Sequence, residues 1–158
     1  MIDESHEPWG EAITLAQENF SKELERIFKK QKWEKATVYF EFWGENSFAG
    51  NHEDESHFLT LLDVAPHKKG ILHPTEFIKL FGHLRIPEVL HHGKFSVALE
   101  NKVKAGELEG MTFEGVVCKG KGKGKMLMPS MFKVKNRAWI HKLRTFCGDD
   151  EKKFNSLM

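Results

Sequence analysis

The spacing of apolar residues changes its period near the N-terminus, and this change most constrains how the 158-residue chain can fold. From about Gly10 to Lys32, apolar side chains recur at steps of three and four, which predicts one amphipathic helix. The run Ala36–Trp43 is rich in β-branched and aromatic residues and predicts a strand. The nearly all-apolar segment His57–Val64 predicts a second, central strand.

Further helices and strands are expected along the rest of the chain. Pro74 opens a short helix with its apolar side chains facing inward, namely Phe77, Leu80, Phe81 and Leu84. After it we expect a short strand at Ile86–Leu90, a short helix at Ser96–Lys104, a strand at Thr112–Lys119, a hairpin loop at Gly120–Lys125, a strand at Met131–Lys135 and an amphipathic segment at Ala138–Phe146. The polar tail from Gly148 is expected to be frayed. This pattern predicts an α+β fold with an antiparallel sheet and flanking helices, in one domain.

Composition and charge exclude several classes of protein. The formal net charge is +1, so any contact with nucleic acid must come from local lysine clusters. The two cysteines, Cys118 and Cys147, form no CxxC pattern and indicate neither a disulfide scaffold nor a zinc ribbon. The acidic N-terminus lacks the apolar region of a signal peptide, and no apolar run approaches the ~18 residues needed to span a bilayer. We therefore expect a cytoplasmic protein.

Three clusters of charged residues fall on predicted strands, where a half-buried sheet favours apolar side chains. They are Glu41-Phe-Trp-Gly-Glu45, Glu114-Gly-Val-Val-Cys-Lys119 and Phe132-Lys-Val-Lys-Asn136. Strand alternation puts Glu41, Trp43 and Glu45 on one face of the first strand. In the same way it puts Lys133 and Lys135 together on one face of a later strand. Carboxylates can bind Mg²⁺ or accept from a ribose hydroxyl, and paired ammonium groups can neutralise phosphate. Each cluster by itself is also typical of a solvated strand face.

The order of the clusters, with Leu61-Leu-Asp-Val64 between the first and the second, resembles motifs III, IIIa, IV and V of the covalent nucleotidyltransferases. That superfamily contains DNA ligases, RNA ligases and mRNA capping enzymes. The segments Tyr39–Gly50 and Lys69–Phe77 are most similar to phage-type ATP-dependent RNA ligases. The resemblance covers about residues 13–145, with motifs III to V at about 38–135 and a terminal helix at about 137–147. It implies that residues 1–158 are the C-terminal portion of an ATP-grasp-like adenylyltransferase domain.

The resemblance also implies a role for each matching residue, with ATP and Mg²⁺ (or Mn²⁺) as cofactors. Glu45 would contact the ribose of ATP, with Glu41 as the alternative. Glu114 would bind the catalytic metal. Lys133 and Lys135 would contact the α-phosphate, with Lys119 as a weaker phosphate ligand. The residue that covers the adenine is left open between Phe58 and Leu62.

The first motif of the family, Lys-x-Asp-Gly, occurs nowhere in this sequence. Its lysine becomes adenylylated in relatives, and nucleophilic catalysis requires that lysine. We therefore expect an RNA ligase fragment that binds ATP and Mg²⁺ and contributes to joining RNA 3′-hydroxyl and 5′-phosphate ends, as in RNA repair. A partner chain, an N-terminal ligase half, would supply the lysine. The alternatives are a non-catalytic nucleotide- or RNA-binding remnant or assembly partner, and a capping-type guanylyltransferase.

Several other features receive structural interpretations. The lysine- and glycine-rich run Lys119–Lys125 is interpreted as a flexible hairpin tip that adds weak electrostatic attraction for RNA. His91 and His92 are expected at the surface, and Cys118 is expected to be a small buried side chain. Trp139 and Phe146 are expected in the core. The missing front half predicts an exposed strand edge and, with it, dimerisation, complementation or poor solubility.

Overall fold

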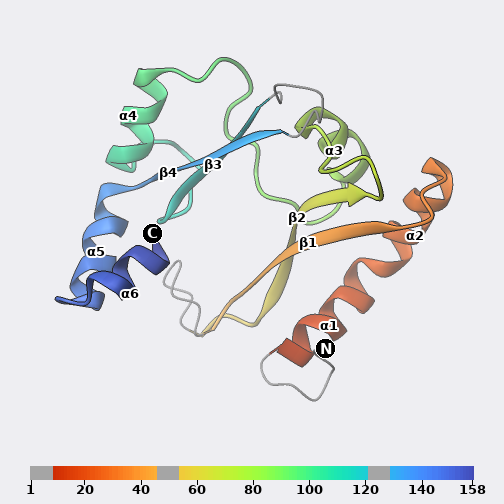
Figure 1. The fold of residues 1–158 in the computed structure, drawn as a ribbon, viewed down its shortest axis with the longest axis horizontal. Coiled ribbons are helices and arrows are strands. Elements are labelled where there is room, and N and C mark those ends of the chain that lie inside the picture. The colour runs from red at the N-terminus through yellow and green to blue at the C-terminus, as the bar shows by residue number, and fades with distance from the viewer. Residues whose placement is uncertain (1–8, 46–53, 121–128) are drawn as a thin grey trace. The chain divides into compact units, whose positions relative to one another are not determined.

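The computed structural model describes residues 9–45, 54–120 and 129–158. In these ranges the chain forms six helices and two small antiparallel sheets, which confirms the α+β class (Figure 1). The chain divides into two compact units, the first within residues 1–47, 52–87 and 120–130, and the second within 48–51, 88–119 and 131–158. Each unit contains a hydrophobic core of its own. None of the described helices combines the length and apolar character needed to cross a membrane.

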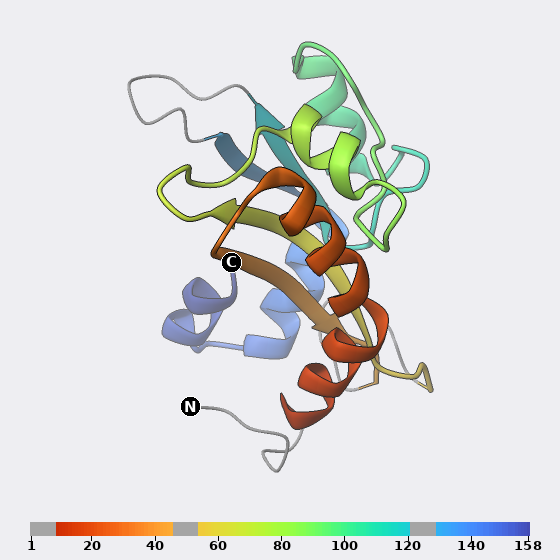
Figure 2. The ribbon, with the colours of Figure 1, turned by 90° about the vertical axis from the view of Figure 1, so that its right-hand side faces the viewer.

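The first unit contains two helices, a β-hairpin and a third helix. Its elements are α1 (Trp9–Asn19), α2 (Ser21–Gln31), β1 (Ala36–Trp43), β2 (Phe58–Pro66) and α3 (Pro74–Phe81). β1 and β2 pair antiparallel, and β1 has the predicted bounds. Figure 2 shows α1 and α2 lying across one face of this sheet. Phe20 fixes that packing because its ring meets the Phe40 ring edge-on, with centroids 4.8 Å apart.

The predicted continuous helix over residues 10–32 is wrong, because the chain leaves helical geometry at Phe20. Its φ of −126° interrupts the helix, and its ring is buried in the core. Neighbouring polar side chains accommodate the break: Asn19 donates to the Leu15 carbonyl at 3.0 Å, and Ser21 donates to the Ala16 carbonyl at 3.3 Å. Burial of one large ring thus prevails over helical periodicity.

The outer edge of β2 is bonded to non-strand backbone. Leu61 donates its N–H to the Arg85 carbonyl at 2.9 Å, and Leu72 donates to the Val64 carbonyl at 3.0 Å. The predicted strand at Ile86–Leu90 is wrong, since this segment has no regular secondary structure. Pro87 lies within it and has no N–H to donate to a ladder.

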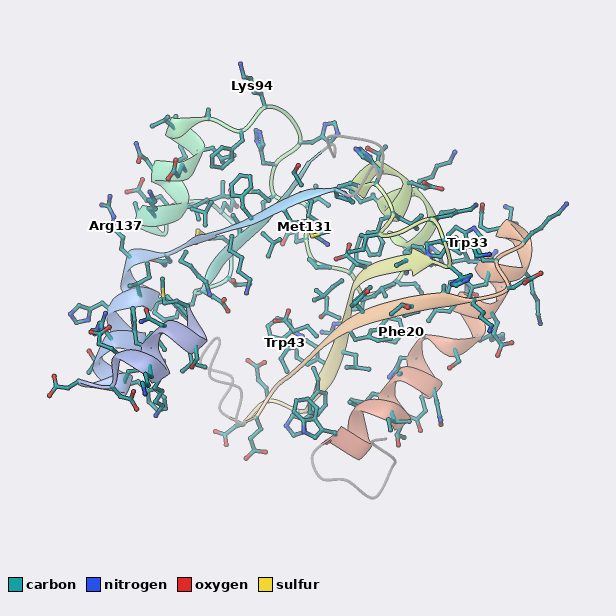
Figure 3. All side chains as sticks on the ribbon, viewed as in Figure 1. Phe20, Trp33, Trp43, Lys94, Met131 and Arg137 are labelled. Atoms are coloured by element: carbon teal, nitrogen blue, oxygen red, sulfur yellow. The ribbon has the colours of Figure 1, made fainter. Side chains whose placement is uncertain are left out.

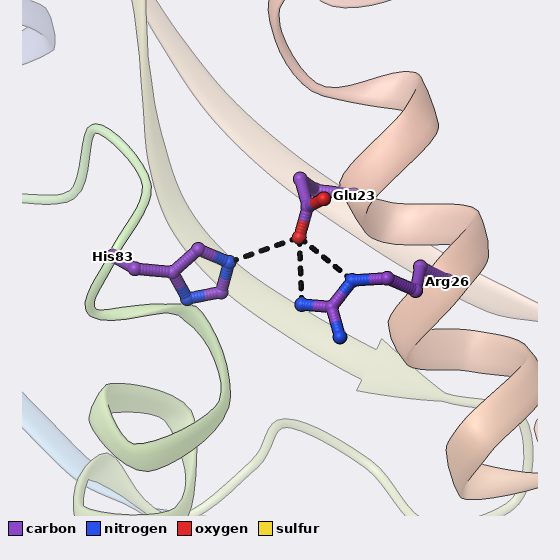
Figure 4. Close-up of polar contacts among 3 residues, drawn as sticks. All are labelled: Glu23, Arg26 and His83. Carbon is purple, nitrogen blue, oxygen red and sulfur yellow. Dashed lines mark hydrogen bonds and ion pairs between the residues drawn. The ribbon is translucent and has the colours of Figure 1, made fainter.

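One polar contact links α2 to the segment that follows α3 (Figure 4). Glu23 accepts hydrogen bonds from Arg26 at 2.7 and 3.0 Å and pairs with the His83 imidazole at 3.2 Å. Arg26 first and His83 second hold the pKa of the Glu23 carboxyl below its ordinary value. The contact is solvent-exposed, so it contributes little to the stability of the fold.

The second unit contains a second β-hairpin and three helices. Its elements are α4 (Val97–Ala105), β3 (Gly115–Gly120), β4 (Ser130–Lys135), α5 (Arg137–Cys147) and α6 (Glu151–Leu157). The core cluster comprises Trp139, Leu143, Cys147 and Phe154. The structure confirms Trp139 as a core residue. The prediction that Phe146 lies in the core is wrong, because its side chain is 53% exposed. The prediction that Cys118 is buried is also wrong, because Cys118 is only half-buried.

The predicted frayed tail is wrong, because α6 folds back on α5. Asp150 caps α6 by accepting a hydrogen bond from the Lys153 N–H at 2.9 Å, and Phe154 is buried. Arg144 of α5 binds across the junction, with its guanidinium 3.6 Å from the Phe154 ring centroid. A single apolar side chain in a polar segment therefore anchors the helix.

The start of β3, the pair His91–His92 and the loop after β3 were also predicted from the sequence. β3 begins at Gly115 instead of Thr112, because Thr112 closes a turn by donating its hydroxyl to the Gly115 carbonyl at 2.9 Å. His91 and His92 are exposed, as predicted. The predicted loop Gly120–Lys125 lies outside the described residues from 121 onward.

Candidate functional site

Glu114, from the second charged cluster of the sequence, contacts both lysines of the third. It stands immediately before β3, and its carbonyl accepts a hydrogen bond from the Asn136 N–H at 2.9 Å. Its carboxylate forms ion pairs with two ammonium groups of β4, those of Lys135 and Lys133, the latter at 3.7 Å. The sequence-predicted residues Glu114, Lys133 and Lys135 therefore meet in one group, which we call the Glu114–lysine cluster.

The two lysines of the cluster differ in their surroundings. The Lys135 side chain is 9% exposed, and its ammonium lies 4.0 Å from the centroid of the Trp139 ring. A cation held between a carboxylate and an indole face has a fixed position. The Lys133 side chain is 61% exposed. Lys133 is therefore the ammonium that a ligand from solvent can reach.

Gly115 sets the approach of the two strands that carry the cluster. Its φ is +138°, and a Cβ placed there would lie 2.1 Å from the Val134 carbonyl oxygen and 2.9 Å from the Lys135 Cα. Only glycine permits this contact. Beyond β4, Asn136 starts α5 by accepting a hydrogen bond from the Ala138 N–H at 2.9 Å, which places Trp139 beside Lys135.

Lys119 lies near the other end of β3 from the Glu114–lysine cluster. Gly115, the first residue of β3, lies against Lys135 of β4, and Lys119 follows it by four positions. The cluster itself presents two ammonium groups and one carboxylate, a combination that suits a phosphate ligand.

The cluster fits a divalent cation only in partnership with a ligand. In the described parts of the chain, no group of three or more His, Cys, Asp or Glu side chains is arranged to hold a metal. Glu114 supplies a single carboxylate. Mg²⁺ is often held by one or two carboxylates, several waters and the phosphates of its substrate. The residues present fit that mode and do not form an all-protein metal cage.

The first unit carries the sequence-predicted nucleoside residues on the hairpin of β1 and β2. Glu41 stands opposite Thr60, and Trp43 stands opposite Phe58. The Trp43 and Phe58 rings lie 4.4 Å apart, and the Trp43 indole N–H donates to the Thr60 hydroxyl at 3.0 Å. In Figure 3, Phe20 lies on the helix side of this sheet and Trp43 lies on the other side. That second face is aromatic and polar.

Glu45 was predicted to face the same way as Trp43 because side chains alternate along a strand, but Glu45 lies beyond the end of the strand. β1 ends at Trp43, and Gly44 has a φ of +134°. The Glu45 N–H donates to the Glu55 carbonyl at 2.9 Å. Its own carbonyl bonds the His57 imidazole at 2.8 Å. Of the two alternatives for the ribose contact, Glu41 is the one that belongs to β1 and alternates onto the same face as Trp43.

His57 links the hairpin to α1, since its other ring nitrogen is 2.7 Å from a carboxylate oxygen of Glu11. The Glu45 carbonyl first, and the Glu11 carboxylate second, raise the pKa of His57. Leu62, the other predicted adenine contact, lies at a register shift that falls between Tyr39 and Phe40 on the facing strand. This β-bulge lies away from the Trp43–Phe58 pair.

The predicted site residues thus form two groups. Glu41, Glu45, Phe58 and Leu62 belong to the first unit, and Glu114, Lys119, Lys133 and Lys135 belong to the second. That the two groups converge on one adenylate remains a prediction.

Sequence reasoning missed two contacts. Arg85 places its guanidinium 3.9 Å from the Phe58 ring centroid, and Trp139 contacts Lys135 as well as filling the core. Trp139 follows Lys135 by four positions across a helix cap, a spacing that could have indicated the contact. Arg85 comes from a loop, and no local pattern predicts its position.

No family model matches the chain, and comparison with curated proteins and with solved structures finds no similar protein. Functional inference therefore depends on the order of the motifs and on the geometry of the two groups.

Proposed function

We propose that this chain is the motif III-to-V portion of an ATP-dependent RNA ligase adenylylation domain, which binds ATP with Mg²⁺. The observation that supports the proposal most is the Glu114–lysine cluster. Residues from two motifs far apart in sequence make direct ion pairs, with one lysine buried against an aromatic ring. A solvated strand face, the simpler interpretation of these charges, would not require the buried lysine.

The chemistry of each residue follows from its surroundings. Lys133 offers an accessible ammonium to a phosphate of ATP, and Lys135 holds the Glu114 carboxylate beside it. Glu114 would hold Mg²⁺ next to the phosphates, where the cation neutralises negative charge. In the first unit, the paired Trp43 and Phe58 rings offer an apolar surface to the adenine, and Glu41 offers an acceptor to the ribose.

Binding of ATP to the 158-residue chain tests the proposal. We expect calorimetry with Mg²⁺ to detect ATP binding, and Lys133→Gln to weaken it by roughly tenfold, the effect of one charged hydrogen bond. Lys104→Gln is the matched control, because Lys104 lies in the same unit and pairs with Glu100 along α4. In a competition experiment, ATP should also displace GTP from the chain, which means that ATP binds more tightly than GTP. Failure to bind ATP would reject the proposal, and a preference for GTP would favour the capping-type alternative.

A further inference from the structure

Building on the proposed function, we propose that Glu114 is the resident counter-anion of the lysine pair, and that phosphate binding displaces its carboxylate from Lys133. Binding of the phosphate and binding of the divalent cation are thereby coupled at this site.

The two pairs are unequal, and this inequality decides which one can open. Lys135 is almost fully buried, touches Trp139 and makes the shorter contact with Glu114. Separation of that pair would leave a buried charge uncompensated, which is costly. Lys133 is largely exposed and 3.7 Å away, so its pair with Glu114 is weak. An incoming anion therefore replaces Glu114 at Lys133 and leaves the pair with Lys135 intact.

Displacement changes what Glu114 can do. While it neutralises both ammonium groups, its oxygens have little capacity for a cation. Once a phosphate has taken Lys133, the carboxylate faces the bound phosphate across a short distance, and the two negative groups repel. A divalent cation held by Glu114 would supply positive charge that offsets this repulsion. Mg²⁺ should therefore favour the phosphate-bound arrangement, and phosphate should favour Mg²⁺ binding by the same factor.

This arrangement predicts that removal of the Glu114 charge strengthens phosphate binding when no divalent cation is present. Glu114→Gln keeps an oxygen that accepts from Lys135 but removes the anion that competes for Lys133. Without divalent cations, inorganic tripolyphosphate should bind this variant about two- to fivefold more tightly than the wild type, as expected for loss of an exposed pair. Mg²⁺ should tighten binding to the wild type by a larger factor than to Glu114→Gln. Association of Mg²⁺ with free tripolyphosphate is common to both proteins and cancels in that comparison.

Isothermal calorimetry on the full chain, with and without Mg²⁺, measures both effects. Glu100→Gln is the matched control, because it also removes one carboxylate from the same unit, and Glu100 pairs with Lys104 along α4. It should bind tripolyphosphate as the wild type does. Equal or weaker binding by Glu114→Gln without Mg²⁺ would overturn the inference. ATP binding that survives that result would leave the proposed function standing.

A second variant decides the matter if Glu114→Gln fails to fold, which circular dichroism would reveal. Lys133→Gln leaves the buried pair of Glu114 and Lys135 in place. It should weaken tripolyphosphate binding and reduce the additional effect of Mg²⁺. Unchanged affinity and an unchanged Mg²⁺ effect in Lys133→Gln would also overturn the inference. Absence of tripolyphosphate binding to the wild type would reject it outright.

Discussion

At the scale of single residues, Gly115 has the most restricted backbone position in the cluster. Gly115→Ala should destabilise the second unit by roughly 2–4 kcal/mol, since the methyl group meets the Val134 carbonyl at a positive φ. Gly120→Ala, at the other end of β3, is the control, because no atom lies within 4 Å of its Cβ position. Thermal unfolding of both variants measures the difference. Equal stability of the two would contradict the close approach of the strands.

His57 gives the fold a pH dependence whose sign is fixed by its contacts. Its pKa is raised in the folded state, so the contact contributes stability below the unfolded value of about 6.5, and this contribution is lost as pH rises through the folded pKa. His57→Gln should therefore lower Tm more at roughly pH 6 than at roughly pH 9. Melting curves at the two pH values check this. An effect of equal size at both, or a larger one at pH 9, would contradict the role of the charged imidazole.

The residues of the second and third clusters could be predicted because their chemistry conflicts with their position. The strand carries Lys133 and Lys135 on one face and Val134 on the other. Two neighbouring positive charges are stabilised by a nearby carboxylate, and Glu114 provides it. The orientation of Glu45 could not be predicted by the same logic. It follows Gly44, whose positive φ ends the alternation on which the prediction rested.

At the scale of helices and strands, regular periodicity predicted β1, α3, α4 and α5 well, whereas single buried side chains decided the exceptions. Phe20 breaks the first helix and Phe154 anchors the last one. A periodic pattern indicates which face of a helix is buried, but it does not indicate where packing against other elements interrupts a helix or anchors a short one. The strand expected at Ile86–Leu90 failed for a local reason, the proline within it.

The anchoring role of Phe154 is a prediction at this scale. Phe154→Ala should destabilise the second unit by about 3–5 kcal/mol, the usual cost of deleting a buried ring. Phe146→Ala removes the same ring from an exposed position on α5 and should change stability by less than about 0.5 kcal/mol. Chemical denaturation compares the two. A cost of less than about 0.5 kcal/mol for Phe154→Ala would mean that α6 contributes little to the core.

At the scale of the whole molecule, the resemblance assigns residues of both units to the binding of one nucleotide. The contacts that define each half are internal to it: Trp43 with Phe58 in one, and Glu114 with its lysines in the other. The two halves are therefore related by the order of their motifs in the sequence and by the function that is proposed for both.

The last prediction concerns covalent chemistry by the whole chain. In the family that the sequence resembles, the lysine that attacks the α-phosphate lies in the tetrapeptide Lys-x-Asp-Gly, which is absent from this sequence. Incubation with α-labelled ATP and Mg²⁺ should therefore leave no label on the 18.3 kDa band after denaturing electrophoresis. Addition of a companion chain that contains Lys-x-Asp-Gly should place the label on the companion, and Glu114→Gln should abolish that transfer while Glu100→Gln preserves it. A labelled 18.3 kDa band would show that one of this chain's own lysines acts as the nucleophile.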